Sequence, residues 1–275
     1  MRPASSSARR SPSARQCRLA RRFAQSRKPK LGKEVLSEYV FRPAAHVVVL
    51  VLAPLRVPPP VVVLASSVSG LAGAVELARG HLIVAALLVQ LKTVLDNADG
   101  QLARLTDRVT AFGRYLDSEC DLLVNAALFA AVGWLTGSPL AAAAGFVAIT
   151  VVLSVNFNLE RLARGFPAAW DKSVLGRVYG LMYGWQDRLV ERFVERRLRG
   201  AGDEARRAYH DSATVGILAN LGMSTQLAVF GVCIAVGHPL WFVAVGFAEL
   251  VLVAALFVRR ESLVNVDREV VLDHH

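Results

Sequence analysis

The chain has 275 residues, 54% of them hydrophobic, and a mean hydropathy of +0.41. This composition excludes an ordinary soluble domain, and the length allows several membrane-spanning helices of about 20 residues each. The formal net charge of +10 does not indicate a nucleic-acid-binding protein, because residues 1–42 hold twelve Lys or Arg against two Glu and the rest of the chain is balanced.

Residues 1–33 are rich in Arg, Ser and Pro and contain few large apolar side chains. They predict a disordered, basic cytoplasmic tail that is attracted to anionic lipid headgroups. No apolar core follows the charges at the distance expected of a secretory signal peptide, so this segment is not predicted to be one.

Residues 34–59 begin with an amphipathic pattern and end in a run of prolines, which stops a helix. This pattern predicts an amphipathic helix that lies at the membrane interface. The alternative is an additional membrane span. The apolar stretch 44–55 is too short to cross a bilayer comfortably and Arg56 follows it directly, so the interfacial position is preferred.

Six apolar segments lie within residues 60–260 and predict an all-α integral membrane domain with six transmembrane helices. Gly80, Gly137 and Gly237 mark tight turns after the first, third and fifth segments. Residues 261–275 form a short polar tail with no assigned role. The predicted spans are 60–77, 81–103, 112–135, 139–159, 213–236 and 239–258.

The distribution of Lys and Arg predicts the orientation of these spans. Basic residues gather in the first 42 residues and in the connection 160–211, whereas the three tight turns carry only Arg79. Both termini, the loop 105–111 and the connection 160–211 are therefore predicted to be cytoplasmic. The protein is expected in the inner (plasma) membrane as a multi-pass protein.

The connection 160–211 combines aromatic residues with alternating charges. Aromatic side chains such as Tyr179 and Tyr183 predict an amphipathic segment that lies along the lipid headgroups. A second interpretation places some of Arg161, Arg164 and Lys172 beside a functional site, where they would bind a phosphate group of the acceptor.

The segment 96–121 reads DNADGQLARLTDRVTAFGRYLDSECD and places four aspartates among apolar spans. A charged side chain at the centre of a membrane helix costs about 2.5–3.5 kcal/mol on insertion scales, so four together are not explained by packing. Asp96 and Asp99 share one helical face, and Asp117 and Asp121 form an i, i+4 pair on the next helix.

Thr110 is a candidate N-cap for the second of these helices, so the segment predicts a helical hairpin that brings the two carboxylate pairs together. Gly100 and Gly113 lie beside the aspartates and would allow a close approach of a helix or a ligand. A site built from oxygen ligands favours Mg²⁺ or Mn²⁺. Two such ions roughly 3.5–4 Å apart are the arrangement expected for phosphoryl displacement.

The same segment fits the pattern DxxDGxxAR, eight residues, GxxxDxxxD without a mismatch, and by it the chain resembles the CDP-alcohol phosphotransferases. The resemblance covers about a tenth of the chain. It implies a membrane enzyme with six transmembrane helices, usually a homodimer. The eight matching residues are Asp96, Asp99, Gly100, Ala103, Arg104, Gly113, Asp117 and Asp121.

The resemblance implies transfer of a phospho-alcohol group from a CDP-alcohol, with CDP-diacylglycerol as the expected donor, to a hydroxyl of a small polar acceptor. CMP is released, as in phospholipid biosynthesis. Asp121 is implied as the base that accepts the hydroxyl proton, and the four aspartates as the metal ligands. The residues implied to bind the CDP group are Asp99, Gly100, Ala103, Arg104, Gly113 and Asp117.

The acceptor alcohol is left open by the sequence. Lys92 lies one turn before Asp96, and Asn125 lies one turn after Asp121. Each either satisfies a buried carboxylate or lines the acceptor pocket. Arg161 and Arg164 are further candidates for binding the acceptor. In many family members that use inositol phosphate or glycerol phosphate a basic residue follows the last aspartate, whereas here Leu122 does.

A polytopic cation transporter is the alternative from another functional class, because it too could bury aspartates in a helical bundle. A transporter gives no reason for Gly100, Arg104 and Gly113 at these offsets. Its acidic residues would also be spread across the membrane, whereas here they gather at one side of it.

Overall fold

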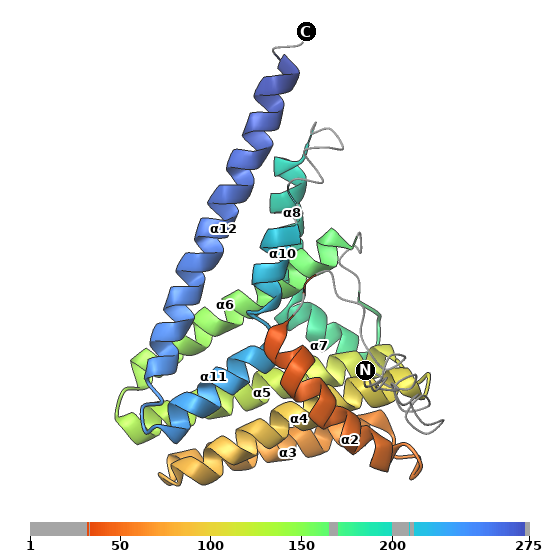
Figure 1. Ribbon diagram of the computed structural model, residues 1–275, viewed down its shortest axis with the longest axis vertical. Coiled ribbons are helices and arrows are strands. Elements are labelled where there is room, and N and C mark those ends of the chain that lie inside the picture. Colours follow the sequence, from red (N-terminus) through yellow and green to blue (C-terminus); the bar gives the residue numbers. More distant parts are fainter. Residues whose placement is uncertain (1–31, 33, 165–169, 200–208, 210–211, 273–275) are drawn as a thin grey trace, which may run out of the picture.

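The computed structural model describes residues 32, 34–164, 170–199, 209 and 212–272, and side chains up to residue 262 (Figure 1). Over this part the chain is helical and has no strand, which confirms the all-α prediction. The predicted basic tail lies outside the described residues except for Gly32. The helices are η1 Ser37–Phe41, α2 Arg42–Leu52, α3 Pro59–Ala78, α4 Leu82–Leu105, α5 Ala111–Thr136, α6 Pro139–Ala163, α7 Val174–Met182, α8 Gly184–Arg197, α10 Ser212–Ala219, α11 Met223–Ala235 and α12 Trp241–Leu272.

Local chemistry explains where these helices begin and end. Pro59 and Pro139 stand at the first positions of α3 and α6, where the missing N–H of proline costs no hydrogen bond. Gly80, Gly137 and Gly237 have φ values of +81°, +64° and +85°, which glycine adopts without steric cost. The three tight turns predicted from the sequence are confirmed, and their connections gather at the left of Figure 1.

Thr110 caps the N-terminus of α5, as predicted. Its hydroxyl oxygen accepts a hydrogen bond of 3.0 Å from the backbone N–H of Gly113. We expect Thr110→Ala to lower the free energy of unfolding by about 1 kcal/mol, because one N–H of the first turn loses its acceptor. Thermal unfolding in detergent should show a fall in Tm of about 2–4 °C. Thr110→Ser keeps the cap and is the control; equal effects of the two changes would contradict the prediction.

Four helices are long and apolar enough to cross a membrane over the described residues: α3, α5, α6 and the part Trp241–Ser262 of α12. Helices α10 and α11 would form a fifth span, but the two are bent by 47°. The sequence predicted one continuous helix here. The break between the two helices begins at Asn220. The side-chain oxygen of Asn220 accepts a 2.9 Å hydrogen bond from the N–H of Val35, so the segment before α2 is held against this bend.

Helix α4 does not reach this apolarity, although it was predicted as the second span. It carries Lys92, Asp96 and Asp99 and is surrounded by other helices, since α2, α3 and α11 all pack against it. Helix α3 also packs against α5, so α4 and α5 share one neighbour (Figure 1). The main hydrophobic core is formed by α3, α4, α5, α6, α11 and α12, and Phe129 and Phe230 stack on each other within it.

Helix α2 packs one face against α4. Ala45 and Val49 are buried there against Ala98 and Leu102, and Val47 on the opposite face is largely exposed. Helix α2 continues η1 without a break, so one helical run covers residues 35–52 and is about 27 Å long. It is not among the described helices that are long and apolar enough to cross a membrane. The interfacial position stays a prediction.

The connection 160–211 contains α7 and α8, and its residues 165–169, 200–208, 210 and 211 lie outside the described part. These two helices pack on the bundle. The Tyr183 hydroxyl donates to the Ser118 carbonyl of α5 at 3.2 Å, and the Asn158 amide of α6 donates to Asp187 at 2.9 Å. The segment is thereby fixed to α5 and α6 on the side where the aspartates lie.

Candidate active site

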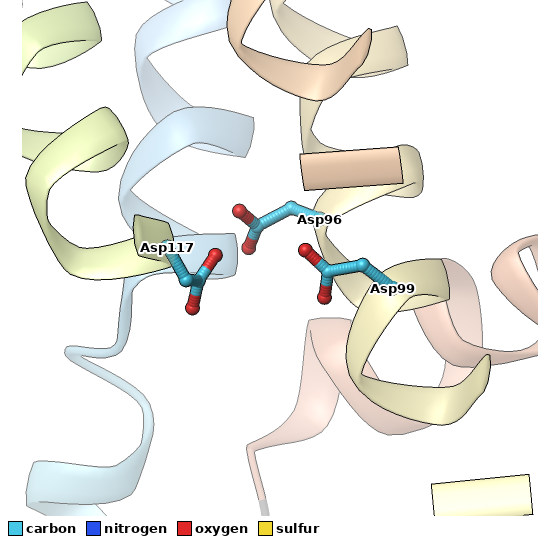
Figure 2. Close-up of side chains that lie close together, drawn as sticks. All are labelled: Asp96, Asp99 and Asp117. Atoms are coloured by element: carbon cyan, nitrogen blue, oxygen red, sulfur yellow. The ribbon is translucent and has the colours of Figure 1, made fainter. Parts of the chain in front are cut away.

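Three of the four predicted aspartates converge. Asp96 and Asp99 project from α4 and Asp117 projects from α5, and one carboxylate oxygen of each lies within 4.8 Å of the other two. Figure 2 shows the three carboxylates pointing toward one another across the space between the helices. The sequence prediction that the two helices bring their carboxylates together is correct for these three residues.

Asp121 is not a member of this group of three. Its carboxylate accepts a hydrogen bond from the ammonium of Lys92, which also donates to Asp96 Oδ1 at 2.7 Å. The Lys92 side chain is 2% exposed. Asp96 therefore belongs to the group of three and also shares the ammonium of Lys92 with Asp121.

The converging carboxylates fit a metal ion. Asp99 Oδ2 is buried and has no hydrogen-bond partner, which is costly for a polar atom unless another group binds there. All the donor atoms of the group are carboxylate oxygens, which suit hard cations such as Mg²⁺ and Mn²⁺. Asp96, Asp99 and Asp117 are the residues that could hold such an ion.

A cavity of about 420 Å³ adjoins these aspartates. Its walls come from the segment before α2 and the first residue of α2, from α4, α5, α6, α7 and α8, and from the start of α11. Of the predicted CDP-binding residues, Asp99, Gly100, Arg104 and Asp117 line it, whereas Ala103 and Gly113 do not. Gly113 instead serves the cap of α5, as described above.

Gly100 makes room for the guanidinium of Arg104. A Cβ atom on Gly100 would lie 3.2 Å from Arg104 Nη1, so the side chain of Arg104 folds back over the bare backbone of its own helix. Arg42, which is buried and ion-paired with Glu38, also lines this side of the cavity. Arg42 was not predicted from the sequence to lie at the site. Its i, i+4 spacing from Glu38 was visible, but nothing in the sequence indicated that α2 lies beside α4.

The predicted acceptor residues separate into two groups. Asn125 lines the cavity, and Lys92, Arg161 and Arg164 do not. Arg161 Nη2 donates to Asn158 Oδ1 at 3.0 Å, and Arg164 Nη2 lies 2.6 Å from Glu160 Oε1. Among the described lining residues, Arg42 and Arg104 are the cations, and both lie on the α2 and α4 side.

Helices α7 and α8 contribute Tyr179, Tyr183 and Asp187 to the cavity wall. The sequence favoured these tyrosines as headgroup anchors, because aromatic spacing does not reveal which face packs on α5 and α6. Burial, followed by the nearby carboxylates of Glu119 and Asp121, raises the pKa of Tyr183. Burial, followed by the carboxylate of Asp187, likewise raises the pKa of Tyr179. Both phenols are therefore protonated near neutral pH and can donate hydrogen bonds.

Comparisons with known proteins match the chain over residues 43–182 to the family model described as CDP-alcohol phosphatidyltransferase. A phosphatidylinositol phosphate synthase from Corynebacterium glutamicum is 46% identical over 55 residues, or 20% of this chain and 25% of the relative. A bifunctional IPC transferase and DIPP synthase from Rubrobacter xylanophilus is 35% identical over 89 residues, or 32% of this chain and 20% of the relative. The matches thus span a quarter or less of each relative's length, and no solved structure matches.

Proposed function

Because the chain belongs to the CDP-alcohol phosphatidyltransferase family and is thus a transferase of phosphate groups, we propose that it moves a phosphatidyl group from CDP-diacylglycerol to a small polar alcohol. The observation that carries this proposal is the convergence of Asp96, Asp99 and Asp117 at a cavity that Arg104 and Gly100 also line. Membership of this family favours a transferase over the alternative of a cation transporter that uses the aspartates as an ion path. Another CDP-alcohol is the second candidate donor.

We propose that Asp96, Asp99 and Asp117 hold a divalent cation, Mg²⁺ or Mn²⁺. When bound, the ion would neutralise the diphosphate of the donor and stabilise the negative charge that develops on the departing CMP. The buried, unpartnered Asp99 Oδ2 supports this assignment, since a carboxylate oxygen in that position is stabilised by a cation.

On the α4 side, Arg104 and Arg42 are proposed to bind the diphosphate and the nucleotide. Guanidinium groups form charge-assisted, often bidentate, hydrogen bonds with phosphate oxygens. Arg104 reaches the cavity because its guanidinium lies over Gly100. This arrangement explains why a glycine precedes the arginine by four residues in the sequence pattern.

Gly100→Ala is expected to raise the KM for CDP-diacylglycerol about tenfold, because the added methyl group displaces Arg104 and weakens one charge-assisted hydrogen bond. Stability should change little, since the contact involves the flexible end of the Arg104 side chain. Gly216→Ala is the control, because a Cβ there meets nothing within 4 Å. Steady-state kinetics in detergent micelles measure the effect, and an unchanged KM would contradict it.

Asp121 is proposed as the base. It lines the same cavity one helical turn after Asp117, and Lys92 fixes its carboxylate. In the proposed reaction the acceptor hydroxyl oxygen forms a bond to the phosphorus of the phosphatidyl group and the bond from that phosphorus to the CMP oxygen breaks. The hydroxyl proton passes to Asp121, a transfer that requires the base within hydrogen-bond reach of the acceptor.

The wall formed by α5, α6, α7 and α8 supports an acceptor that carries hydroxyl groups and no phosphate. Its described lining residues include hydrogen-bonding groups such as Asn125, Tyr183 and Asp187 but no Lys or Arg. The positive charge of Arg161 on α6 acts on Asp187 and Tyr179 of this wall, but Arg161 does not line the cavity and donates to Asn158. Arg164, also on α6, is bound to Glu160. The corynebacterial relative is named for the synthesis of phosphatidylinositol phosphate, but that match covers only 20% of this chain and does not carry a product or acceptor over to it.

We propose that the chain crosses the membrane six times, with α4 as the second span and α10 with α11 as the fifth. At 24 residues α4 is about 36 Å long, enough to cross the hydrocarbon core, and its polar residues are shielded by its neighbours. In this proposal residues 34–59 lie at the interface before the membrane domain 60–260. Both termini, including tail 261–275, and the cavity face the cytoplasm.

We propose that the protein lies in the inner (plasma) membrane, on the basis of its charge distribution. We also propose that it forms a homodimer, on the basis of the family resemblance. The exposed apolar residues on the outside of the bundle, such as Trp134 and Leu140, support contact with lipid or with a second copy.

Release of CMP from CDP-diacylglycerol by the purified chain tests the function. The assay uses detergent micelles, Mg²⁺, and a panel of acceptors that contains inositol, inositol phosphate, glycerol phosphate and serine. We expect release that depends on one acceptor without a phosphate group and that stops when EDTA is added. Release only with a phosphorylated acceptor would contradict the acceptor assignment, and release that persists in EDTA would contradict the metal assignment.

A further inference from the structure

Lys92 is a buried cation inside the group of aspartates. Its side chain leaves α4 between α3 and α5 and passes beside Gly70, where a Cβ atom would lie 3.2 Å from Lys92 Cγ. The ammonium donates to Asp96 Oδ1 at 2.7 Å and to the carboxylate of Asp121. A buried lysine is stable only when its charge is paired, and here two carboxylates on two helices pair it.

This position places the four aspartates in two groups, one of three and one of two, that share Asp96. Asp96, Asp99 and Asp117 offer oxygens within 4.8 Å of one another, as a single ion requires. Asp96 and Asp121 are joined by the ammonium instead. A second Mg²⁺ bridging these two would need to lie about 2.0–2.1 Å from their oxygens, in the space that the ammonium occupies.

We propose that the ammonium of Lys92 takes the place of a second metal ion, so that each chain binds a single divalent cation. This inference rests on the proposed function and replaces the pair of ions expected from the sequence. Lys92 acts as a positioning residue: it supplies a fixed positive charge beside the diphosphate site and keeps Asp121 outside the set of metal ligands. The ammonium of Lys92 then holds Asp121 beside the cavity, and no second metal ion has to bind to do so.

The close passage beside Gly70 is a second sign that the lysine is built into the bundle. A Cβ on Gly70 would lie 2.4 Å from Val124 Cγ1, so a glycine on α3 is required for α5 to approach at this level. At this level the Lys92 side chain is buried between the helices, and its ammonium reaches Asp121.

Counting bound Mn²⁺ on the purified full chain tests the inference directly. We expect saturation at one Mn²⁺ per chain and the electron paramagnetic resonance spectrum of an isolated ion. Two Mn²⁺ per chain with the spectrum of an exchange-coupled pair, as expected for ions roughly 3.5–4 Å apart, would overturn the inference and leave the proposed function standing. Absence of bound Mn²⁺ would overturn the proposed metal site and this inference with it.

Lys92→Met gives a second test, because it removes the ammonium and retains an unbranched apolar stem. The folded variant should bind a second Mn²⁺ between Asp96 and Asp121 and show the coupled spectrum. Lys172→Met, at an exposed lysine that does not line the cavity, should keep the wild-type count. If folded Lys92→Met binds no second ion, Lys92 does not occupy an ion position. If the variant does not fold, the count on the wild-type chain decides.

Discussion

Asp99→Asn is expected to lower the rate of CMP release by at least about 1,000-fold, the effect of losing roughly 4 kcal/mol of stabilisation of the departing charge. Asp99 is the most buried of the three converging aspartates and holds the unpartnered oxygen Oδ2. An amide of the same size cannot supply a negative ligand there. Binding of Mn²⁺ should weaken in parallel with the loss of activity.

Asp107→Asn is the matched control for this change. Asp107 is exposed in the turn between α4 and α5 and has a φ of +51°, a conformation that asparagine adopts readily. Activity and Mn²⁺ binding of this variant should equal those of the wild type. If Asp99→Asn loses CMP release as predicted but keeps the Mn²⁺ affinity of the wild type, Asp99 acts in some way other than as a metal ligand.

Asp121→Asn is expected to lower kcat by about 10²–10⁴-fold, the usual contribution of a general base. Mn²⁺ binding and the KM for CDP-diacylglycerol should change little, because Asp121 lies outside the group of three carboxylates. The measurement is a comparison of kcat, donor KM and Mn²⁺ affinity in one detergent preparation.

Glu119→Gln is the matched control for Asp121→Asn, since it removes a carboxylate two residues earlier on α5 that does not line the cavity. Its kcat should stay close to that of the wild type. A fall in Mn²⁺ affinity of Asp121→Asn as large as that of Asp99→Asn would instead make Asp121 a metal ligand. It would also contradict the role assigned to Lys92.

The connection of α7 and α8 illustrates what the sequence did not predict. Their amphipathic pattern is equally compatible with a lipid surface and with a protein surface, because both bury one apolar face. The hydrogen bonds of Tyr183 to α5 and of Asp187 to α6 show that one face packs on the protein, and contact of these helices with the lipid headgroups stays a prediction. Arg161 and Arg164 were candidates for the acceptor pocket for the same reason, since sequence spacing does not fix how α6 is rotated about its axis.

The sequence by itself determined the helical class, the three glycine turns, the Thr110 cap and the pattern of aspartates. These features depend on backbone φ values, on the first turn of a helix and on spacing within one helix, which are local properties. The tertiary structure alone decided that Lys92 bridges Asp96 and Asp121, that Arg42 reaches the cavity and that α10 and α11 are bent. Each of these depends on which helix faces are buried against one another, and that choice is made by packing between segments far apart in the chain.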